Sequence, residues 1–103
     1  MNEDDKKAAV AELCSAIMSL KSEDEANAFL RDLCTPGELQ AVAERWRIAR
    51  MLDAGGMSYR EIARAIGAST TTVARVARFL RDEPWHGYRL VLDRLNQEER
   101  PAE

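Results

Sequence analysis

No run of apolar residues in this 103-residue sequence is long enough to span a bilayer, although 46% of the residues are hydrophobic. The opening residues MNEDDKK are acidic and then basic, and no apolar segment typical of a secretion signal follows them. Charged residues make up 32% of the chain, as is usual for a globular protein. These observations exclude a membrane protein and predict a soluble protein in the cytoplasm.

Residues that build metal centres and active sites are also scarce. Cys14 and Cys34 are the two cysteines, His86 is the single histidine, and none has a second Cys or His at ligand spacing. Each cysteine stands among apolar helical residues, so we predict two buried thiols and neither a metal nor a cofactor. Paired carboxylates, a nucleophile with a base and a phosphate-binding Gly loop are absent too, which argues against an enzyme.

Strand patterns and internal repeats are absent as well. Apolar residues recur instead at spacings of three and four, which predicts an all-α fold of six helices. Start signals stand at Ser22 with Glu25 and at Thr35 to Glu38, where Pro follows the capping residue. The expected helices run from about Asp5 to Leu20, after Ser22, from Pro36 to the Gly55-Gly56 pair, twice within residues 58–80, and after Pro84 up to a polar tail at residues 96–103.

The length predicts a single domain over residues 1–103, which would bury only about two-thirds of its surface when folding alone. The long third helix has an apolar stripe formed by Leu39, Val42, Ala43, Trp46, Ala49 and Leu52. The helices outside residues 58–80 need further partners for their apolar sides. We therefore predict a homodimer with Trp46 in the core at its centre.

Residues 58–80, SYREIARAIGASTTTVARVARFL, have the layout of a helix-turn-helix. Ser58 and Glu61 form a capping box at the start of the first helix, and Gly67 suits a left-handed turn at its end. Ser69 can then cap the second helix. A stripe at i, i+3, i+4 and i+7 predicts the buried side of that helix, formed by Val73, Val76, Ala77 and Leu80.

The net charge of −3 hides an uneven distribution. Residues 1–44 carry a net −6, residues 45–81 a net +6, and residues 82–103 a net −3. All positive charges in the middle segment are arginines, and no acid occurs between Ala63 and Leu80. The positive potential is therefore concentrated where the helix-turn-helix stands, as a local phosphate-binding surface requires.

A helix-turn-helix with a basic outer face can place its second helix in the major groove of double-stranded DNA. The polar residues at the start of that helix are predicted to reach base edges, and these are Ser69, Thr70, Thr71 and Thr72. Four arginines are predicted to contact phosphates and can also read a guanine, namely Arg60, Arg64, Arg75 and Arg78.

Several short motifs occur together: TP-x-E at residues 35–38, R-x-R-I at 45–48, G-x-M-S-x-R-E at 55–61, and the turn at Gly67. In these motifs residues 33–84, about half the chain, resemble the bacterial Trp repressor family. The resemblance implies an all-α, six-helix, intertwined homodimer that binds operator DNA through the second helix of the motif. The short acidic N-terminus is similar to the subgroup of repressor-like proteins without an established role for tryptophan.

In tryptophan-responsive members of that family, two arginines hold the indole and a threonine of the partner chain completes the site. Thr35, Arg45 and Arg75 stand at the matching positions. Val76 replaces a glycine and Phe79 replaces a small serine, so apolar bulk occupies space that the ligand would need. L-Tryptophan is thus not expected as an effector. Either these two residues act as a built-in plug, or another effector takes its place.

The leading hypothesis is a transcriptional repressor that binds a palindromic operator as a homodimer. The alternative is a helical protein-interaction module that uses the same helix-turn-helix fold to dock on a protein partner. The acidic first third of the chain would suit such contacts. An interaction module would show no salt-dependent binding to duplex DNA, whereas a repressor would.

Overall fold

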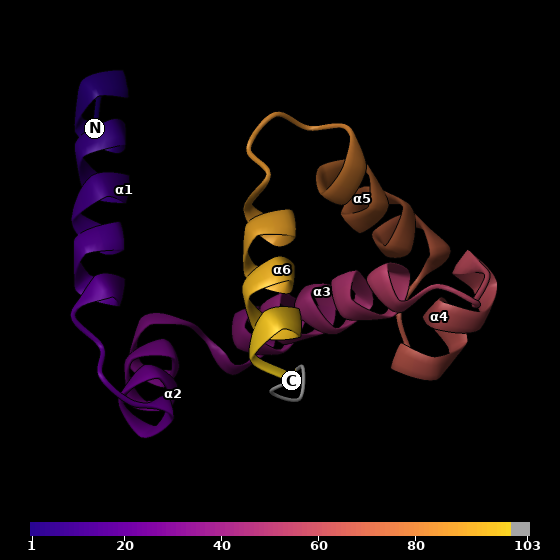
Figure 1. Cartoon of the computed structure of the whole chain (residues 1–103). Coiled ribbons are helices and arrows are strands. Elements are labelled where there is room, and N and C mark those ends of the chain that lie inside the picture. Colours follow the sequence, from indigo (N-terminus) through magenta and orange to yellow (C-terminus); the bar gives the residue numbers. More distant parts are fainter. Residues whose placement is uncertain (100–103) are drawn as a thin grey trace. The chain divides into compact units, whose positions relative to one another are not determined.

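The computed structural model describes residues 1–99, which form helices and no strands (Figure 1). Each predicted helix is present. The bounds are α1 Glu3–Met18, α2 Glu23–Leu33, α3 Pro36–Ala54, α4 Tyr59–Ile66, α5 Thr70–Arg81 and α6 Gly87–Glu99. No helix within this part of the chain combines the length and the apolar character that crossing a membrane requires.

The predicted boundaries of α1 and α6 differ from the observed ones. Helix α1 runs from Glu3 to Met18 rather than from about Asp5 to Leu20. Helix α1 begins at Glu3 because Asn2 caps it, with the N–H of Asp5 donating to Asn2 Oδ1 at 2.8 Å. Helix α6 continues to Glu99, through residues that were predicted to be tail. The remainder of the predicted tail, residues 100–103, lies outside the described residues.

The predicted capping boxes at α3 and α4 are formed in full. At α2 the Ser22 side chain accepts from the N–H of Glu25, but the Glu25 carboxylate accepts from the N–H of Lys21 instead of that of Ser22. At α4 the N–H of Glu61 donates to Ser58 Oγ at 3.1 Å, and the N–H of Ser58 donates to the Glu61 carboxylate at 3.2 Å. At α3 the N–H of Thr35 donates to the Glu38 carboxylate at 2.9 Å, which lowers the pKa of Glu38. These bonds explain why the helices begin where the sequence predicts.

Residues 1–39 form one compact unit, which contains α1, α2 and the first residues of α3. Neither α1 nor α2 buries a residue. Val10 and Ile17, which stand on α1 at the helical spacing of its apolar residues, remain 60% and 47% exposed. The prediction of two buried thiols is wrong for this chain, because Cys14 is exposed and Cys34 is half-buried. Among residues 1–99 of a single copy, the apolar residues of α1 are therefore not part of a buried core.

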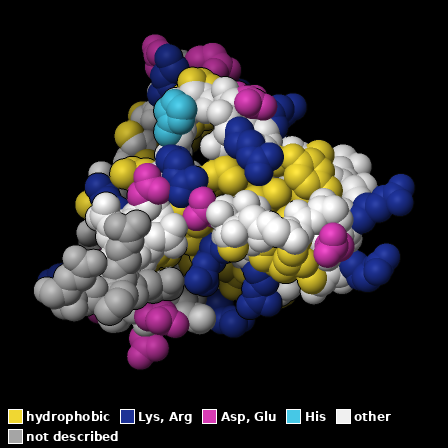
Figure 2. All heavy atoms as spheres, turned by 45° about the vertical axis from the view of Figure 1, so that its right-hand side comes forward, with side chains coloured by type: hydrophobic (Ala, Val, Ile, Leu, Met, Phe, Trp, Pro, Cys, Tyr) yellow, Lys and Arg dark blue, Asp and Glu magenta, His cyan; other side chains and the backbone are white. Residues whose placement is uncertain are grey.

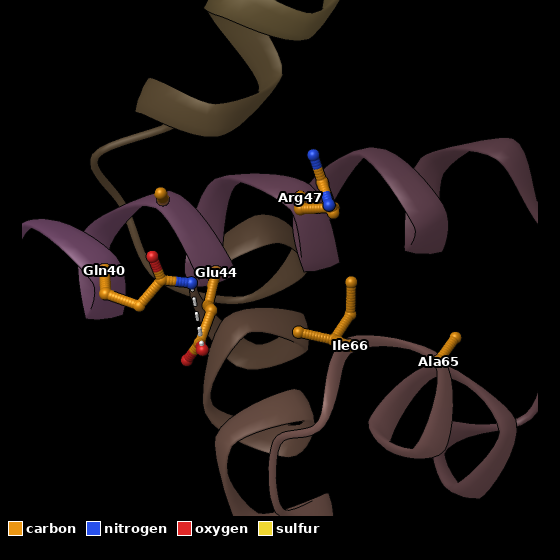
Figure 3. Close-up of a pocket in the computed structure, with 6 residues that line it drawn as sticks. Gln40, Glu44, Arg47, Ala65 and Ile66 are labelled. Atoms are coloured by element: carbon orange, nitrogen blue, oxygen red, sulfur yellow. Dashed lines mark hydrogen bonds between the residues drawn. The ribbon is translucent and has the colours of Figure 1, made fainter.

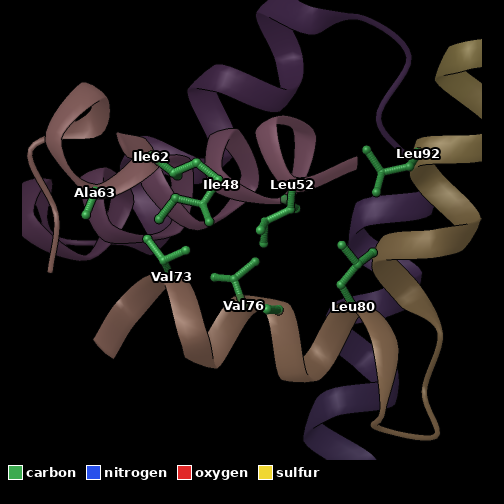
Figure 4. Packing of buried hydrophobic residues seen from close by; sticks show 10 residues of the cluster. Ile48, Leu52, Ile62, Ala63, Val73, Val76, Leu80 and Leu92 are labelled. Atoms are coloured by element: carbon green, nitrogen blue, oxygen red, sulfur yellow. The ribbon is translucent and has the colours of Figure 1, made fainter. Parts of the chain in front are cut away.

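A second compact unit begins at residue 40 and contains the hydrophobic core. Helix α5 supplies its whole predicted stripe, and α4 supplies Ile62 and Ala63. From α3 come Ala49 and Leu52 as predicted, and also Ile48, which the predicted stripe omits although it is fully buried. In Figure 4 the side chains of Ile48 and Leu52 point toward those of α5. The prediction of a single domain over residues 1–103 stays a prediction.

The turn between α4 and α5 depends on Gly67, whose φ of +80° lies in the left-handed region. Its N–H donates to the carbonyl of Ala63 at 2.8 Å, and the N–H of Ala68 donates to the same carbonyl at 3.0 Å. A residue with a Cβ would be strained in this conformation, whereas glycine is not. The glycine therefore ends α4 and redirects the chain into α5, as the sequence predicts.

A polar network and an aromatic pair join α6 to α3. Arg89 Nη1 of α6 lies 2.8 Å from Asp53 Oδ1 of α3, and Asn96 Nδ2 donates to Asp53 Oδ2 at 3.1 Å. Next to these contacts, the rings of Trp46 and Tyr88 stack with their centroids 6.4 Å apart. Trp46 is half-buried, and Leu92 of α6 is buried, with 2% of its surface exposed.

Substitution of Asp53 by Asn should make the protein less stable at about pH 7, by about 1–2 kcal/mol at fixed protein concentration. Hydrogen bonds from Arg89 and then Asn96 lower the pKa of Asp53 below its ordinary range. A lowered carboxyl pKa stabilises the fold above about pH 4, and this contribution is lost as the pH falls through the folded-state pKa. The difference between wild type and D53N should therefore shrink on acidification, as measured by urea unfolding.

Asp93→Asn is the matched control for this prediction. Asp93 also pairs with Arg89, at 2.8 Å, but within α6 and with an exposed side chain. Its loss should cost no more than about 0.5 kcal/mol. If D93N were as destabilising as D53N, the contact between the two helices would not be the source of the effect.

Candidate nucleic-acid interface

Seven of the eight residues predicted to contact DNA lie on helices α4 and α5. The eighth, Ser69, is the N-cap residue of α5. The side chains of Val73, Val76, Ala77 and Leu80 face the core, so the opposite side of α5 is left for other contacts. Thr71, Arg75 and Arg78 are exposed there. The residues predicted to contact DNA therefore all belong to the α4–α5 pair, and none of them is among the buried apolar residues of that pair.

The start of α5 is polar and has no acidic residue in its first turn. Ser69 Oγ accepts a hydrogen bond from the N–H of Thr72 at 3.1 Å and lies 3.0 Å from Thr72 Oγ1. Ser69 and the half-buried Thr72 are therefore engaged in the cap, whereas Thr70 and Thr71 are exposed. The N-terminal end of a helix carries a partial positive charge, which favours a nearby phosphate.

The four predicted arginines are all exposed, Arg60 and Arg64 on α4 and Arg75 and Arg78 on α5. Figure 2 shows basic side chains projecting from the part of the surface that α4 and α5 occupy. Arg78 is partly engaged, because its Nε lies 3.4 Å from Glu83 Oε1 just beyond the end of α5. Such an exposed ion pair is weak and can exchange its carboxylate for a phosphate.

Phe79 lies against two of these arginines. The Cζ atom of Arg75 is 4.5 Å from the centroid of its ring, and the Cζ atom of Arg78 is 5.1 Å from it. The ring itself is half-buried. Both guanidinium groups are within the distance at which a cation is attracted to an aromatic face.

Sequence reasoning missed a contact that joins the two helices at their far ends. Arg81 Nη1, at the end of α5, donates to the hydroxyl of Tyr59, the first residue of α4, at 3.3 Å. No short-range pattern marks such a pair, because the residues are 22 positions apart. The stack of Arg75 on Phe79 was open to prediction, since residues at i and i+4 are neighbours on a helix.

The sequence model that describes the Trp repressor protein family matches residues 8–96, from within α1 to within α6. The chain belongs to the Trp repressor family. Among curated proteins it is similar to the uncharacterized protein YerC of Bacillus subtilis (strain 168). The two are 41% identical over 88 residues, which span 85% of this chain and 83% of YerC.

Two solved structures are similar over nearly their whole length. A TrpR-like protein from Eubacterium eligens has a TM-score of 0.81 and 40% identity, over 96% of this chain and 100% of that chain. A structure described as a candidate Trp repressor from Staphylococcus aureus has a TM-score of 0.79 and 37% identity, over 93% of this chain and 96% of that chain. The predicted Trp-repressor-like all-α fold is confirmed, and the family makes this protein a DNA-binding regulator.

Several positions that match the tryptophan site of the Trp repressor family have packing or hydrogen-bond partners within the chain. Thr35 Oγ1 accepts the N–H of Glu38 at 3.1 Å in the α3 cap, and Arg45 is half-buried on α3. Val76 is 1% exposed within the core, and Phe79 has the guanidinium of Arg75 over its ring. The two bulky residues thus already have packing partners within the chain.

One shallow pocket of about 360 Å³ lies between α3 and the end of α4 (Figure 3). Its lining comprises Gln40, Ala43, Glu44, Arg47, Ala65 and Ile66. Gln40 Nε2 donates to Glu44 Oε1 at 3.4 Å across its rim. None of the residues predicted for the effector site or for DNA contact lines it.

Proposed function

We propose that this Trp repressor family protein is a sequence-specific transcriptional repressor that binds a palindromic operator as an intertwined homodimer. The observation that carries the proposal is the helix pair α4 and α5, whose exposed side is basic and whose second helix starts with polar, acid-free residues. A recognition helix of this kind contacts base edges with its first residues and phosphates with its arginines.

The proposed roles follow the exposure of the side chains. Thr70 and Thr71 read base edges. Ser69 and Thr72 form the cap of α5 and also contact base edges with the part of their side chains that faces outward. The phosphates are contacted by Arg60, Arg64, Arg75 and Arg78. Charge-assisted bonds of this type are stronger than neutral ones, and the fork of a guanidinium fits a phosphate in bidentate fashion.

Exposed apolar side chains support the homodimer. Val10, Ile17 and Leu33 in residues 1–39, and Leu90 and Val91 on α6, are each at least 44% exposed in a single copy. Apolar side chains left exposed on several helices are typical of an interface. A second copy would cover them, and its two-fold symmetry would present two recognition helices to the two halves of a palindrome.

Selection of random duplexes by the purified protein, followed by sequencing, tests the proposal as a whole. The expected result is an enriched palindrome whose half-site spacing reports the separation of the two recognition helices. No enriched sequence, or no salt-dependent binding to any duplex, would favour the protein-interaction module instead.

Arg60→Ala and Thr71→Ala should weaken DNA binding in different ways. Loss of the Arg60 phosphate contact should reduce affinity for the selected operator and for random duplex alike, by about tenfold. Thr71→Ala should leave random binding nearly unchanged but alter the base preference at the position that Thr71 reads. Fluorescence anisotropy with both duplexes measures the effects. If each variant lost the same affinity for the operator as for the random duplex, the proposal that Thr71 reads a base would be wrong.

We also infer that this repressor holds its DNA-binding conformation without L-tryptophan. The burial of Val76 in the core and the stack of Arg75 on Phe79 support this, because both residues would have to move to admit an indole. Calorimetric titration with L-tryptophan should therefore give no saturable heat, while a duplex titration of the same sample verifies that it is active. Saturable binding at micromolar L-tryptophan would contradict the inference.

A further inference from the structure

The ring of Phe79 lies close to two cations on the exposed side of α5. Arg75 stands four residues before it and Arg78 directly before it, with their Cζ atoms 4.5 and 5.1 Å from the ring centroid. The ring is half-buried, and a phenylalanine side chain has fewer rotatable bonds than an arginine side chain. The two guanidinium groups therefore lie against a surface that is more rigid than they are.

Long arginine side chains lose conformational freedom when they bind a phosphate, and this loss weakens binding. A partner that holds the guanidinium beforehand reduces the loss. A carboxylate would also hold it, but would neutralise the charge that attracts DNA. An aromatic ring holds the cation through its negative face and leaves the full positive charge available to a phosphate.

Arg78 contacts both a carboxylate and an aromatic ring. Its Nε lies 3.4 Å from the Glu83 carboxylate, and its Cζ lies 5.1 Å from the Phe79 ring. A DNA phosphate would compete with Glu83 for the same donors, whereas it would not displace the ring. Arg75 has the closer ring contact, at 4.5 Å, and within residues 1–99 no carboxylate lies at ion-pair distance from it.

We propose that Phe79 is a positioning residue for DNA binding, which orders the guanidinium groups of Arg75 and Arg78 toward the phosphates without touching DNA itself. This role rests on the proposed DNA-binding function and adds a determinant of affinity that is neither basic nor polar. It also gives Phe79 a use beyond filling space near Val76.

Phe79→Leu and Phe79→Tyr, each in the full-length chain, test the proposal with a fluorescent duplex of random sequence at low salt. Leucine keeps apolar volume but has no π face, so affinity should fall about two- to fivefold, whereas tyrosine should stay within about twofold of wild type. The slope of log affinity against log salt should be unchanged in both, because every arginine is still present. Thermal unfolding checks that F79L is folded at the assay temperature.

A double-mutant cycle separates positioning from a purely structural role. In a variant that carries Arg75→Ala and Arg78→Ala, Phe79→Leu should cause no further loss of affinity, since no guanidinium remains to be ordered. An equal loss in both backgrounds, or wild-type affinity of F79L in the native background, would overturn the proposal. If F79L does not fold, Phe79→Met replaces it in the same cycle. Wild-type protein that binds no duplex would instead refute the proposed function, and the role of Phe79 with it.

Discussion

The affinity of this DNA-binding regulator for its selected duplex is expected to fall about ten thousandfold as monovalent salt rises from about 50 to about 200 mM. Four exposed arginines are proposed to contact phosphates in each chain, Arg60, Arg64, Arg75 and Arg78, so the proposed dimer would make about eight such contacts. Each neutralised phosphate releases about 0.9 of a condensed counterion, which gives a log–log slope of about −7. With this slope, a fourfold rise in salt concentration lowers the affinity by about ten thousandfold.

Anisotropy titrations with the selected operator at several salt concentrations measure this slope. Arg64→Ala removes two contacts per dimer and should make the slope less steep by about 2. Arg94→Ala, an equal change of charge at an exposed position on α6, is the matched control and should leave the slope nearly unchanged. A wild-type slope shallower than about −2, or equal slopes for R64A and R94A, would refute the proposed set of phosphate contacts.

Ile62→Ala should destabilise the protein by about 2–5 kcal/mol, a large part of the free energy of unfolding of a small domain. Ile62 is fully buried at the centre of the core, where its side chain lies beside that of Ile48 in Figure 4. Truncation leaves a cavity that close-packed neighbours can fill only in part. Because the same core sets the position of α5 against α4, affinity for DNA should fall as well.

Urea unfolding followed by helical circular dichroism, at fixed protein concentration, measures the loss. Ile62→Val removes a single methylene group and should cost about 0.5–1.5 kcal/mol, so the two variants form a graded series. Thr71→Ala, at an exposed position of α5, should change stability by no more than about 0.5 kcal/mol. If I62A were as stable as T71A, the core would not be what orients the helix pair.

Helix starts and the turn could be predicted because they depend on residues only a few positions apart. The capping bonds of Ser58 and Glu61 span three residues, and Gly67 ends α4 through the carbonyl of Ala63. Such bonds form within one turn whatever the rest of the chain does. The buried stripe of α5 was predictable for a related reason, since its four apolar residues share one helix face.

The buried side of α3 could be predicted only in part. Its apolar residues fall on more than one face, and periodicity alone does not choose between them. In the structure Ile48 is fully buried, whereas Val42 of the predicted stripe is 46% exposed. Which face is covered depends on where α4 and α5 pack against the helix, and that is a property of the folded core.

By itself, the sequence determined the six helices, the caps at Thr35, Ser58 and Ser69, the helix-turn-helix and the concentration of positive charge on it, because spacing along one chain sets each of them. Only the tertiary structure decided which polar side chains meet between helices. Arg89 and Asn96 reach Asp53 across two helices, and Arg81 reaches Tyr59 at the far end of the helix pair. Contacts between residues far apart in the chain exist only after the core has packed, since packing sets the distances between helices.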